Sequence, residues 1–212
     1  MNKRILIDSN IAWIGEIPNS WKLLKHRNLF SKRKNIVGEA SEEYDVLSLT
    51  INGVIKRNLE NNDGKMPETF DGYQKVIKND LIMCLFDIDV TPRCIGFSEI
   101  NGIISPAYTI FEGKKEFQFD IKYYYYWYLM LDNDKKLLHL SKNLRSSIKT
   151  DELLALPLVY PPYEEQKKIS EFLDDKIEKA NQEIENHKKA IKMLEEYKKS
   201  LIYEVVTGKV EV

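Results

Sequence analysis

The stretch EEQKKISEFLDDKIEKANQEIENHKKAIKMLEEYKKSLIYEVV, residues 164–206, decides how this chain of 212 residues is built. It contains no proline and no glycine, and its apolar residues recur in alternating steps of about four and three, as at the a and d positions of a coiled coil. We expect one long helix whose seam consists of Leu173, Ile177, Ala180, Ile184, His187, Ile191, Leu194, Lys198, Leu201 and Val205.

A continuous helix over these residues would be about 60 Å long, at a rise of about 1.5 Å per residue. The preceding part of the chain is too short to cover an apolar stripe of that length, and it contains no second long helical pattern. The seam therefore predicts a partner helix, from another copy of the chain or from another protein.

The part before the long helix has a different pattern, with short apolar runs broken by Gly, Asn, Asp and Pro. It predicts an α+β fold: a globular domain over residues 1–160, followed by a coiled-coil helix in 161–212. Asn-Gly pairs favour hairpin turns. We expect three strand pairs: around Asn52-Gly53, around Asn101-Gly102 between 94–97 and 103–111, and between 76–77 and 81–86.

Helices are expected over Ile121–Leu131, Lys135–Leu140 and Thr150–Ala155, the last with Thr150 or Asp151 as its N-cap, and a strand over Leu156–Tyr160. The first of these helices contains the aromatic run YYYYWY, residues 123–128. Aromatic rings can stack on unpaired bases, but the apolar neighbours of this run favour packing in the core.

Composition excludes several classes of protein. Hydrophobic residues make up 43% of the chain and charged residues 31%, which suits a folded domain, while the net charge of −1 gives no overall basic excess for nucleic acid. Two cysteines and three scattered histidines do not predict a metal site. We find no apolar run of membrane-spanning length and no signal peptide, so we expect a cytoplasmic protein with reduced thiols.

Candidate catalytic residues are few. Tyr160-Pro161-Pro162-Tyr163 is similar to the Pro-Pro-Tyr loop of amino-methyltransferases, but tyrosine replaces the residue that accepts the target amine, and no glycine-rich cofactor turn precedes it. Asp87 and Asp89, with Glu112-Gly113-Lys114, could suggest a nuclease metal site, although such short matches arise by chance in a charged chain. The sequence favours a binding protein without enzymatic activity and without a cofactor.

Three segments, in order, resemble the specificity subunits of type I restriction-modification enzymes. They are DSNIAWIGEIPNSW at 8–21, GIISPAY at 102–108, and LPLVYPPYEEQ at 156–166, the last continued by Ile169, Phe172–Asp174 and VTGK at 206–209. The resemblance covers essentially the whole chain, and its first and last segments are the specific ones.

The resemblance implies a target recognition domain that reads one half of a split site in double-stranded DNA, followed by a helix that sets the distance to the other half. In that family the methyltransferase (modification) subunits methylate adenine, and a restriction subunit can join them. Full-length members have two recognition domains and two spacer helices, whereas this chain has one of each. It therefore resembles a half-subunit, expected to form a homodimer through antiparallel long helices.

Base and phosphate contacts in such a domain require basic and polar side chains on loops. The segment at 141–149, with three cations and no acid, is the best candidate, and weaker candidates lie beside the first hairpin and beside the strand at Cys94. The expected DNA-binding residues are Lys142, Asn143, Arg145, Ser146, Ser147, Lys149, Lys56, Arg57 and Arg93. The competing hypothesis is a coiled-coil adaptor, or an inactive remnant, without DNA specificity.

Overall fold

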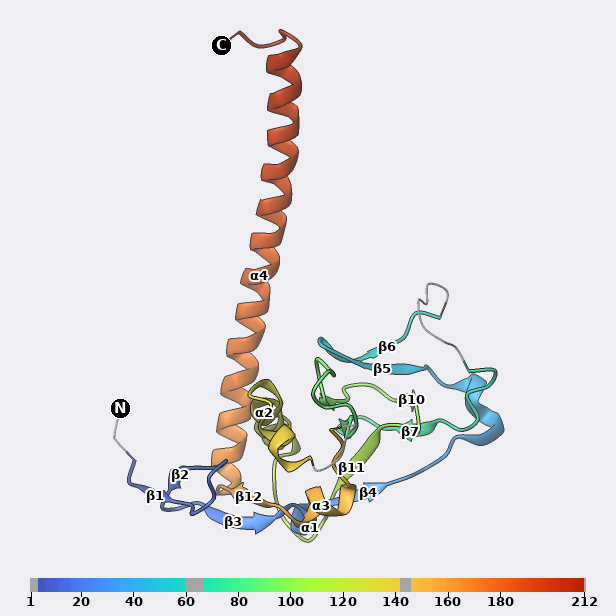
Figure 1. Ribbon diagram of the computed structural model, residues 1–212, viewed down its shortest axis with the longest axis vertical. Coiled ribbons are helices and arrows are strands. Elements are labelled where there is room, and N and C mark those ends of the chain that lie inside the picture. The colour runs from blue at the N-terminus through green and yellow to red at the C-terminus, as the bar shows by residue number, and fades with distance from the viewer. Residues whose placement is uncertain (1–3, 60–66, 142–145, 212) are drawn as a thin grey trace. The chain divides into compact units, whose positions relative to one another are not determined.

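The computed structural model describes residues 4–59, 67–141 and 146–211 (Figure 1). The chain divides into two compact units, Met1–Lys167 and Lys168–Val212. The first, which we call the globular unit, combines short antiparallel strands with short helices, and the second contains most of one long helix. The α+β fold class with a long C-terminal helix is thus confirmed.

A four-stranded antiparallel sheet forms the centre of the globular unit. Its order is β4 (Phe30–Arg33), β11 (Thr109–Gly113), β8 (Leu81–Met83) and β9 (Ile95–Phe97). All three residues of β8 are at most 1% exposed. This strand is apolar at each position because both of its faces are covered.

The hairpin predicted around Asn52-Gly53 is confirmed as β5 (Leu47–Thr50) paired with β6 (Gly53–Lys56). The positive φ of its turn falls on Gly53, at 94°, and not on Asn52. The hairpin packs closely on β9: a Cβ added at Gly96 would lie 2.5 Å from Leu49 Cδ1. Glycine at this position allows the contact.

The prediction of a hairpin around Asn101-Gly102 is wrong. β10 (Gly102–Ile104) pairs with β7 (Gln74–Val76), whereas β9 pairs with β8. The Asn101 side chain accepts a hydrogen bond from the Lys78 backbone N–H, at 2.8 Å. A Cβ on Gly102 would lie 2.5 Å from the carbonyl oxygen of Asp45. This glycine therefore serves a close approach between backbones, not a turn.

The predicted pairing of 76–77 with 81–86 is also wrong. A tight turn does join β7 to β8, because the buried Asp80 carboxylate accepts a hydrogen bond from the Ile77 N–H at 2.7 Å. The two strands then enter different sheets, β7 beside β10 and β8 between β11 and β9.

Helix α2 (Ile121–Asn133) is confirmed, and it begins at Asp120, whose carboxylate accepts hydrogen bonds from the N–H groups of Lys122 and Tyr123. The predicted core role of the aromatic run is also confirmed for Tyr123, Tyr124 and Tyr128, which are at most 5% exposed. The Tyr124 hydroxyl donates to the Val159 carbonyl at 3.1 Å, so its polar end is satisfied within the core.

The remaining short elements enclose this core. They are β1 (Leu6–Asp8), β2 (Glu16–Pro18), β3 (Lys22–Lys25), α1 (His26–Leu29), η1 (Gly38–Glu43), η2 (Lys136–Leu140), α3 (Thr150–Ala155) and β12 (Pro157–Tyr160). The expected strand at 156–160 is β12, paired with β3. The expected cap of α3 is wrong: Lys149 occupies the N-cap and makes no side-chain cap hydrogen bond.

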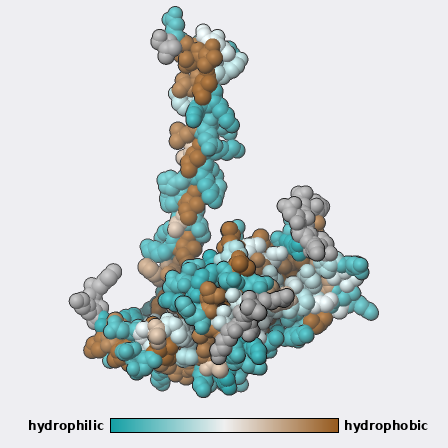
Figure 2. Space-filling model, in the orientation of Figure 1, coloured by the Kyte–Doolittle hydropathy of each residue, from teal (hydrophilic) through white to brown (hydrophobic). Residues whose placement is uncertain are grey.

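Helix α4 (Tyr163–Val206) is continuous over 44 residues, as predicted. Its seam is uncovered: Ile184 is 52% exposed, Ile191 57% and Leu194 66%. Figure 2 shows apolar residues in a row along this helix. Among the described residues, no helix is long and apolar enough to cross a membrane.

Candidate nucleic-acid interface

The best candidate segment lies only partly within the described residues. Lys142, Asn143 and Arg145 fall outside them, so their predicted DNA contacts remain predictions. The part that follows is anchored: Ile148 is 4% exposed, and its N–H donates to the Leu85 carbonyl at 2.9 Å. Ser147 is half-buried, and Lys149 is exposed at the start of α3. A fixed backbone thus presents the Lys149 side chain to solvent.

The segment between β8 and β9, residues 85–93, lies against this anchor, and we call it the 85–93 loop. The Ile88 N–H donates to the Ser146 carbonyl at 3.3 Å. The Lys135 ammonium also donates to the loop, to the carbonyls of Thr91 at 2.8 Å and Ile88 at 3.3 Å. The loop backbone is therefore held from two sides.

Three non-glycine residues in this region have left-handed backbones: Asp87 at φ 49°, Lys135 at φ 50° and Ser146 at φ 43°. Such conformations cost roughly 1–3 kcal/mol each and concentrate at functional sites. Their joint presence at the contact between the 85–93 loop and Ser146–Ile148 favours this region as the binding surface.

Arg93, another predicted DNA contact, lies at the end of the same loop. Its guanidinium donates to the Asn133 side chain at 2.9 Å and lies 3.6 Å from the Asp132 carboxylate. Asp132 is buried and also accepts from the Cys94 N–H at 2.9 Å. These contacts give Arg93 a structural role in fixing the loop to the end of α2.

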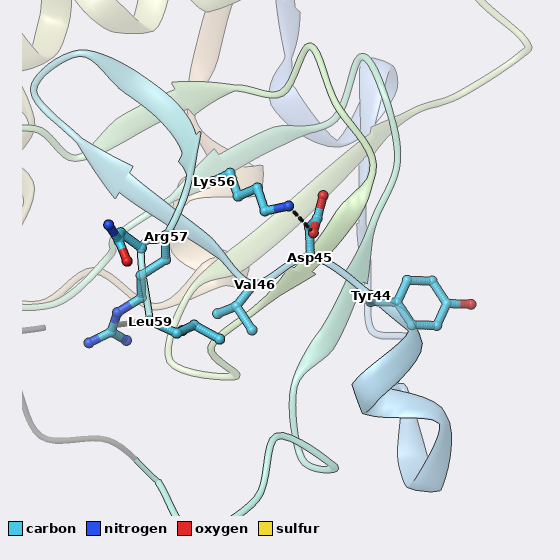
Figure 3. A pocket seen from close by; sticks show the side chains of 7 residues that line it. Tyr44, Asp45, Val46, Lys56, Arg57 and Leu59 are labelled. Carbon is cyan, nitrogen blue, oxygen red and sulfur yellow. Dashed lines mark ion pairs between the residues drawn. The ribbon is translucent and has the colours of Figure 1, made fainter. Parts of the chain in front are cut away.

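Lys56 and Arg57 lie elsewhere, at the end of β6. They line an open pocket together with Tyr44, Asp45, Val46, Asn58 and Leu59 (Figure 3). Lys56 pairs with Asp45 at 2.5 Å, and Figure 3 shows the Arg57 guanidinium pointing away from this pair. None of Ser146, Ser147 or Lys149 lines this pocket.

The residues that could have suggested a nuclease site are dispersed. Glu112, in β11, lies 3.7 Å from Arg33, whose guanidinium also pairs with buried Asp80. Asp89 is exposed in the 85–93 loop. Within residues 4–59, 67–141 and 146–211, no group of three or more His, Cys, Asp or Glu side chains could hold a metal ion.

The first segment that carries the family resemblance builds a compact turn between β1 and β2. Asp8 accepts from the Asn10 N–H at 2.8 Å, and Ser9 Oγ accepts from the Ile11 N–H at 3.2 Å. Asn10 and Gly15 both have positive φ, at 57° and 74°, which explains an asparagine and a glycine at these positions.

The first and last of these segments meet in the globular unit. The Trp21 indole N–H donates to the Glu165 carboxylate at 2.9 Å, and Arg4 pairs with the same side chain. Gln166 is fully buried, where it accepts from the Asp120 N–H and donates to the Pro161 carbonyl. The Pro-Pro-Tyr-Glu-Glu-Gln stretch thus anchors the first turn of α4.

The middle segment, Gly102–Tyr108, also has a structural role. Buried Gln74 donates to the carbonyls of Ser105 and Tyr108, at 3.3 and 2.9 Å, and so holds the turn between β10 and β11. The three segments therefore form the scaffold. The sequence pointed to Arg93 but not to the rest of the 85–93 loop as part of the candidate surface, because nothing local marks Lys135 or Ser146 as left-handed.

The sequence matches a known protein family over part of its length. Residues 103–193 match the sequence model described as the type I restriction modification DNA specificity domain. No curated protein matches the sequence.

Solved structures to which the chain is similar include the type I restriction-modification S subunit from M. genitalium, with a TM-score of 0.49 and 16% identity over 82% of this chain and 41% of that chain. The HsdS subunit from Thermoanaerobacter tengcongensis has a TM-score of 0.45 and 12% identity, over 80% of this chain and 39% of that chain. A chain from work on complex assembly and conformational transition of the type I R-M system has a TM-score of 0.48 and 12% identity, over 77% of this chain and 40% of that chain. The chain spans about two fifths of the length of these structures. Residues 103–193, a little under half of the chain, are thus similar to the type I restriction modification DNA specificity domain.

Proposed function

We propose that this chain is a DNA-recognition half-subunit of a type I restriction-modification complex. The observation that carries the proposal is the family match over residues 103–193, which begins in the globular unit and continues into α4. The globular unit would read one half of a split DNA site, with the surface around the 85–93 loop and Ser146–Lys149 against the duplex. The helix α4 would set the distance to the second half.

The second half is best supplied by another copy of the chain. The exposed seam of α4 needs a helix, and its charges select the orientation. Residues 171–185 carry six acids and two lysines, whereas residues 188–199 carry five lysines and two acids. Antiparallel pairing of two copies sets each acidic stretch against a basic one, and parallel pairing sets like charges together. Each exposed ion pair contributes only about 0.2–1 kcal/mol. We therefore expect the ion pairs to determine the orientation of the helices, and the apolar seam to provide most of the free energy of dimerisation.

The chemistry would come from partner subunits. Methyltransferase subunits bound to the dimer would methylate adenine within the recognised sequence, and a restriction subunit could join the same complex. The chain itself would contribute DNA specificity and geometry, in the cytoplasm, without a cofactor.

The test is to delete the gene in its host, restore it, and sequence methylated adenines genome-wide. A split methylated motif that disappears on deletion and returns with the wild-type gene is the expected result. The matched control restores an Ile184→Glu variant, which places a charge in the seam and should not return the motif. A methylome that is identical in all strains would overturn the proposal.

The rival function is a coiled-coil adaptor that has no DNA specificity. The net charge of −1 is the observation in its favour, because most DNA-binding domains are basic. It predicts a dimer that forms normally, with DNA binding that is equally weak for every sequence.

A further inference from the structure

The globular unit has a second basic surface, separate from the 85–93 loop and Ser146–Lys149. Residues 17–38 contain six cations and no acid. Five of these cations are exposed, and we call them the basic band: Lys22, Lys25, Arg27, Lys32 and Lys34. The net charge of −1 for the whole chain therefore conceals a local basic patch.

The basic band follows three successive elements along one edge of the globular unit. β3, α1 and β4 follow one another directly in the chain, and Figure 1 shows them along one side of the unit. β4 is also an edge strand of the four-stranded sheet. At about 3.3 Å per strand residue and about 1.5 Å per helical residue, residues 22–34 span at most about 35 Å. This length is close to one turn of B-DNA, about 34–36 Å.

The charges of the basic band are not neutralised by neighbouring acids. Arg33, the sixth cation, is half-buried, pairs with buried Asp80 and lies 3.7 Å from Glu112. Among the residues that the structure describes, none of the five band side chains forms an ion pair. Arg27 is oriented by a hydrogen bond from its Nε to the Leu154 carbonyl, at 3.3 Å. The band thus presents five uncompensated positive charges to solvent.

Helix α3 joins the basic band to the surface around the 85–93 loop. The helix begins after Lys149, which belongs to that surface, and packs against α1 and β4. Leu154, the residue that accepts from the band, lies about 8 Å along the helix from Lys149, at about 1.5 Å per residue. Two exposed acids, Asp151 and Glu152, lie between them in the chain. The band is therefore a distinct patch within reach of the same duplex.

The composition of the basic band favours a nucleic acid over a protein as its partner. Protein–protein interfaces are depleted in lysine and have an apolar core, whereas protein–DNA interfaces are polar and strongly positive. Four of the five band residues are lysines, and the large apolar residues exposed within 22–36 are Leu23, at 37%, and Ile36, at 42%. Lysine binds phosphate as a point charge, so a row of lysines suits the DNA backbone.

We propose that the basic band binds the sugar–phosphate backbone of the DNA beside the half-site that the globular unit reads. This inference rests on the DNA-recognition function proposed for the chain. The band contributes affinity that is independent of base sequence and fixes the position of the globular unit on the duplex. Discrimination between sequences comes from the 85–93 loop and Ser146–Lys149.

The experiment is fluorescence anisotropy with the full chain and two duplexes, one containing the motif found in the methylome and one with its bases scrambled. The variants are Lys25→Gln, Lys32→Gln and Lys34→Gln, alone and combined. Each lost phosphate contact should make the salt slope shallower by about 0.9 per copy of the chain, which is about fivefold in affinity at about 0.15 M salt. Both duplexes should lose affinity by the same factor, because a phosphate contact carries no sequence information.

The matched control is Lys122→Gln. Its ammonium lies 5.8 Å from the centroid of the Phe97 ring in β9, at the opposite edge of the sheet from β4, so the salt slope should not change. Urea unfolding of each variant would show that the fold is retained.

The outcomes separate this inference from the proposed function. An unchanged slope in the combined variant, while the wild type still prefers the motif, would overturn the role of the band and leave the proposed function standing. A loss confined to the motif duplex would also overturn it, because these lysines would then read bases. Wild-type protein that binds both duplexes equally would overturn the proposed function, and this inference with it.

Discussion

His26 is a buried histidine that couples the stability of the globular unit to pH. Its side chain is 1% exposed beside the Tyr128 ring, and Nδ1 donates to the Leu156 carbonyl at 2.8 Å. Burial lowers the pKa of His26 to about 4, although the hydrogen bond to Leu156 opposes this shift. The imidazole is therefore neutral in the folded protein at neutral pH.

A histidine with a lowered pKa destabilises the fold in acid, because the unfolded chain binds a proton that the folded chain excludes. The free energy of unfolding should be unaffected by His26 above about pH 6.5 and should fall as pH drops toward about 4, by at most about 3 kcal/mol. Urea unfolding followed by tryptophan fluorescence would measure it. His26→Asn should flatten this part of the pH profile, and the exposed control His139→Asn should not. Parallel profiles for wild type and His26→Asn would refute the assignment.

Substitutions of Arg145 and Lys142 would test whether the segment at 141–149 binds DNA. Arg145→Ala should weaken binding to the methylated motif by about 1–3 kcal/mol if the guanidinium reads a base. Lys142→Ala should instead reduce the salt dependence of binding by about one unit of slope if the ammonium contacts a phosphate. Lys115→Ala, at an exposed site between β11 and α2, is the control. Unchanged affinity and slope in both variants, measured by fluorescence anisotropy, would remove this segment from the interface.

Two glycines of similar appearance in the sequence should respond very differently to a methyl group. Gly102→Ala would place Cβ 2.5 Å from the Asp45 carbonyl oxygen and 2.7 Å from Leu47 Cγ, so β10 and β5 would have to separate. We expect a loss of about 1–3 kcal/mol in the free energy of unfolding, the usual cost of overpacking. Gly72→Ala meets nothing within 4 Å and is the matched control. Equal stability of the two variants by urea unfolding would show that the close approach is not needed.

Gly102 also shows which features of the helices and strands could not be predicted from the sequence. Helices α2 and α4 were predictable because their signals are local: an N-capping acid and an apolar spacing near 3.6 residues. The sequence did not allow us to predict how the short strands pair, namely β7, β8, β9 and β10. Each of them has only three residues, and its pairing depends on segments that are distant in the chain. Asn101-Gly102 has the composition of a turn, yet Asp45, far away in the chain, explains the glycine.

The candidate site was predictable to a smaller extent than the fold. A loop rich in cations is visible in sequence, and Lys149 is indeed exposed there. The anchoring of that loop by Leu85 and Ile88 is not visible, because these contacts join segments distant in sequence. The ion pair of Arg93 with buried Asp132 was not visible in the sequence either, and the predicted DNA contact of Arg93 stays a prediction.

At the scale of the whole molecule, a homodimer imposes symmetry on the DNA. Two identical globular units related by a two-fold axis read identical half-sites in opposite directions. The methylated motif is therefore expected to be a split palindrome, which methylome sequencing of the host would show directly. Two unrelated half-sites would mean that a second recognition protein supplies one of them.

The length of α4 should determine the gap between the half-sites. Duplicating the heptad Ile177–Glu183 keeps the seam in register and lengthens each helix by about 10.5 Å, at about 1.5 Å per residue. In an antiparallel pair, the two helices lie side by side between the globular units. Lengthening both helices therefore increases the separation of the units by about 10.5 Å, not by twice that distance. At about 3.4 Å per base pair, the gap should grow by about three base pairs.

The half-site sequences themselves should not change in this variant, because the globular units are untouched. A two-residue insertion at the same position is the control: at 3.6 residues per turn it rotates the seam by about 200°, so it should weaken the dimer and abolish the methylated motif. The gap is measured in the methylome of a host that carries each variant. A heptad variant that dimerises normally but keeps the original gap would show that α4 does not set the spacing, and that the globular units are positioned on DNA by other contacts.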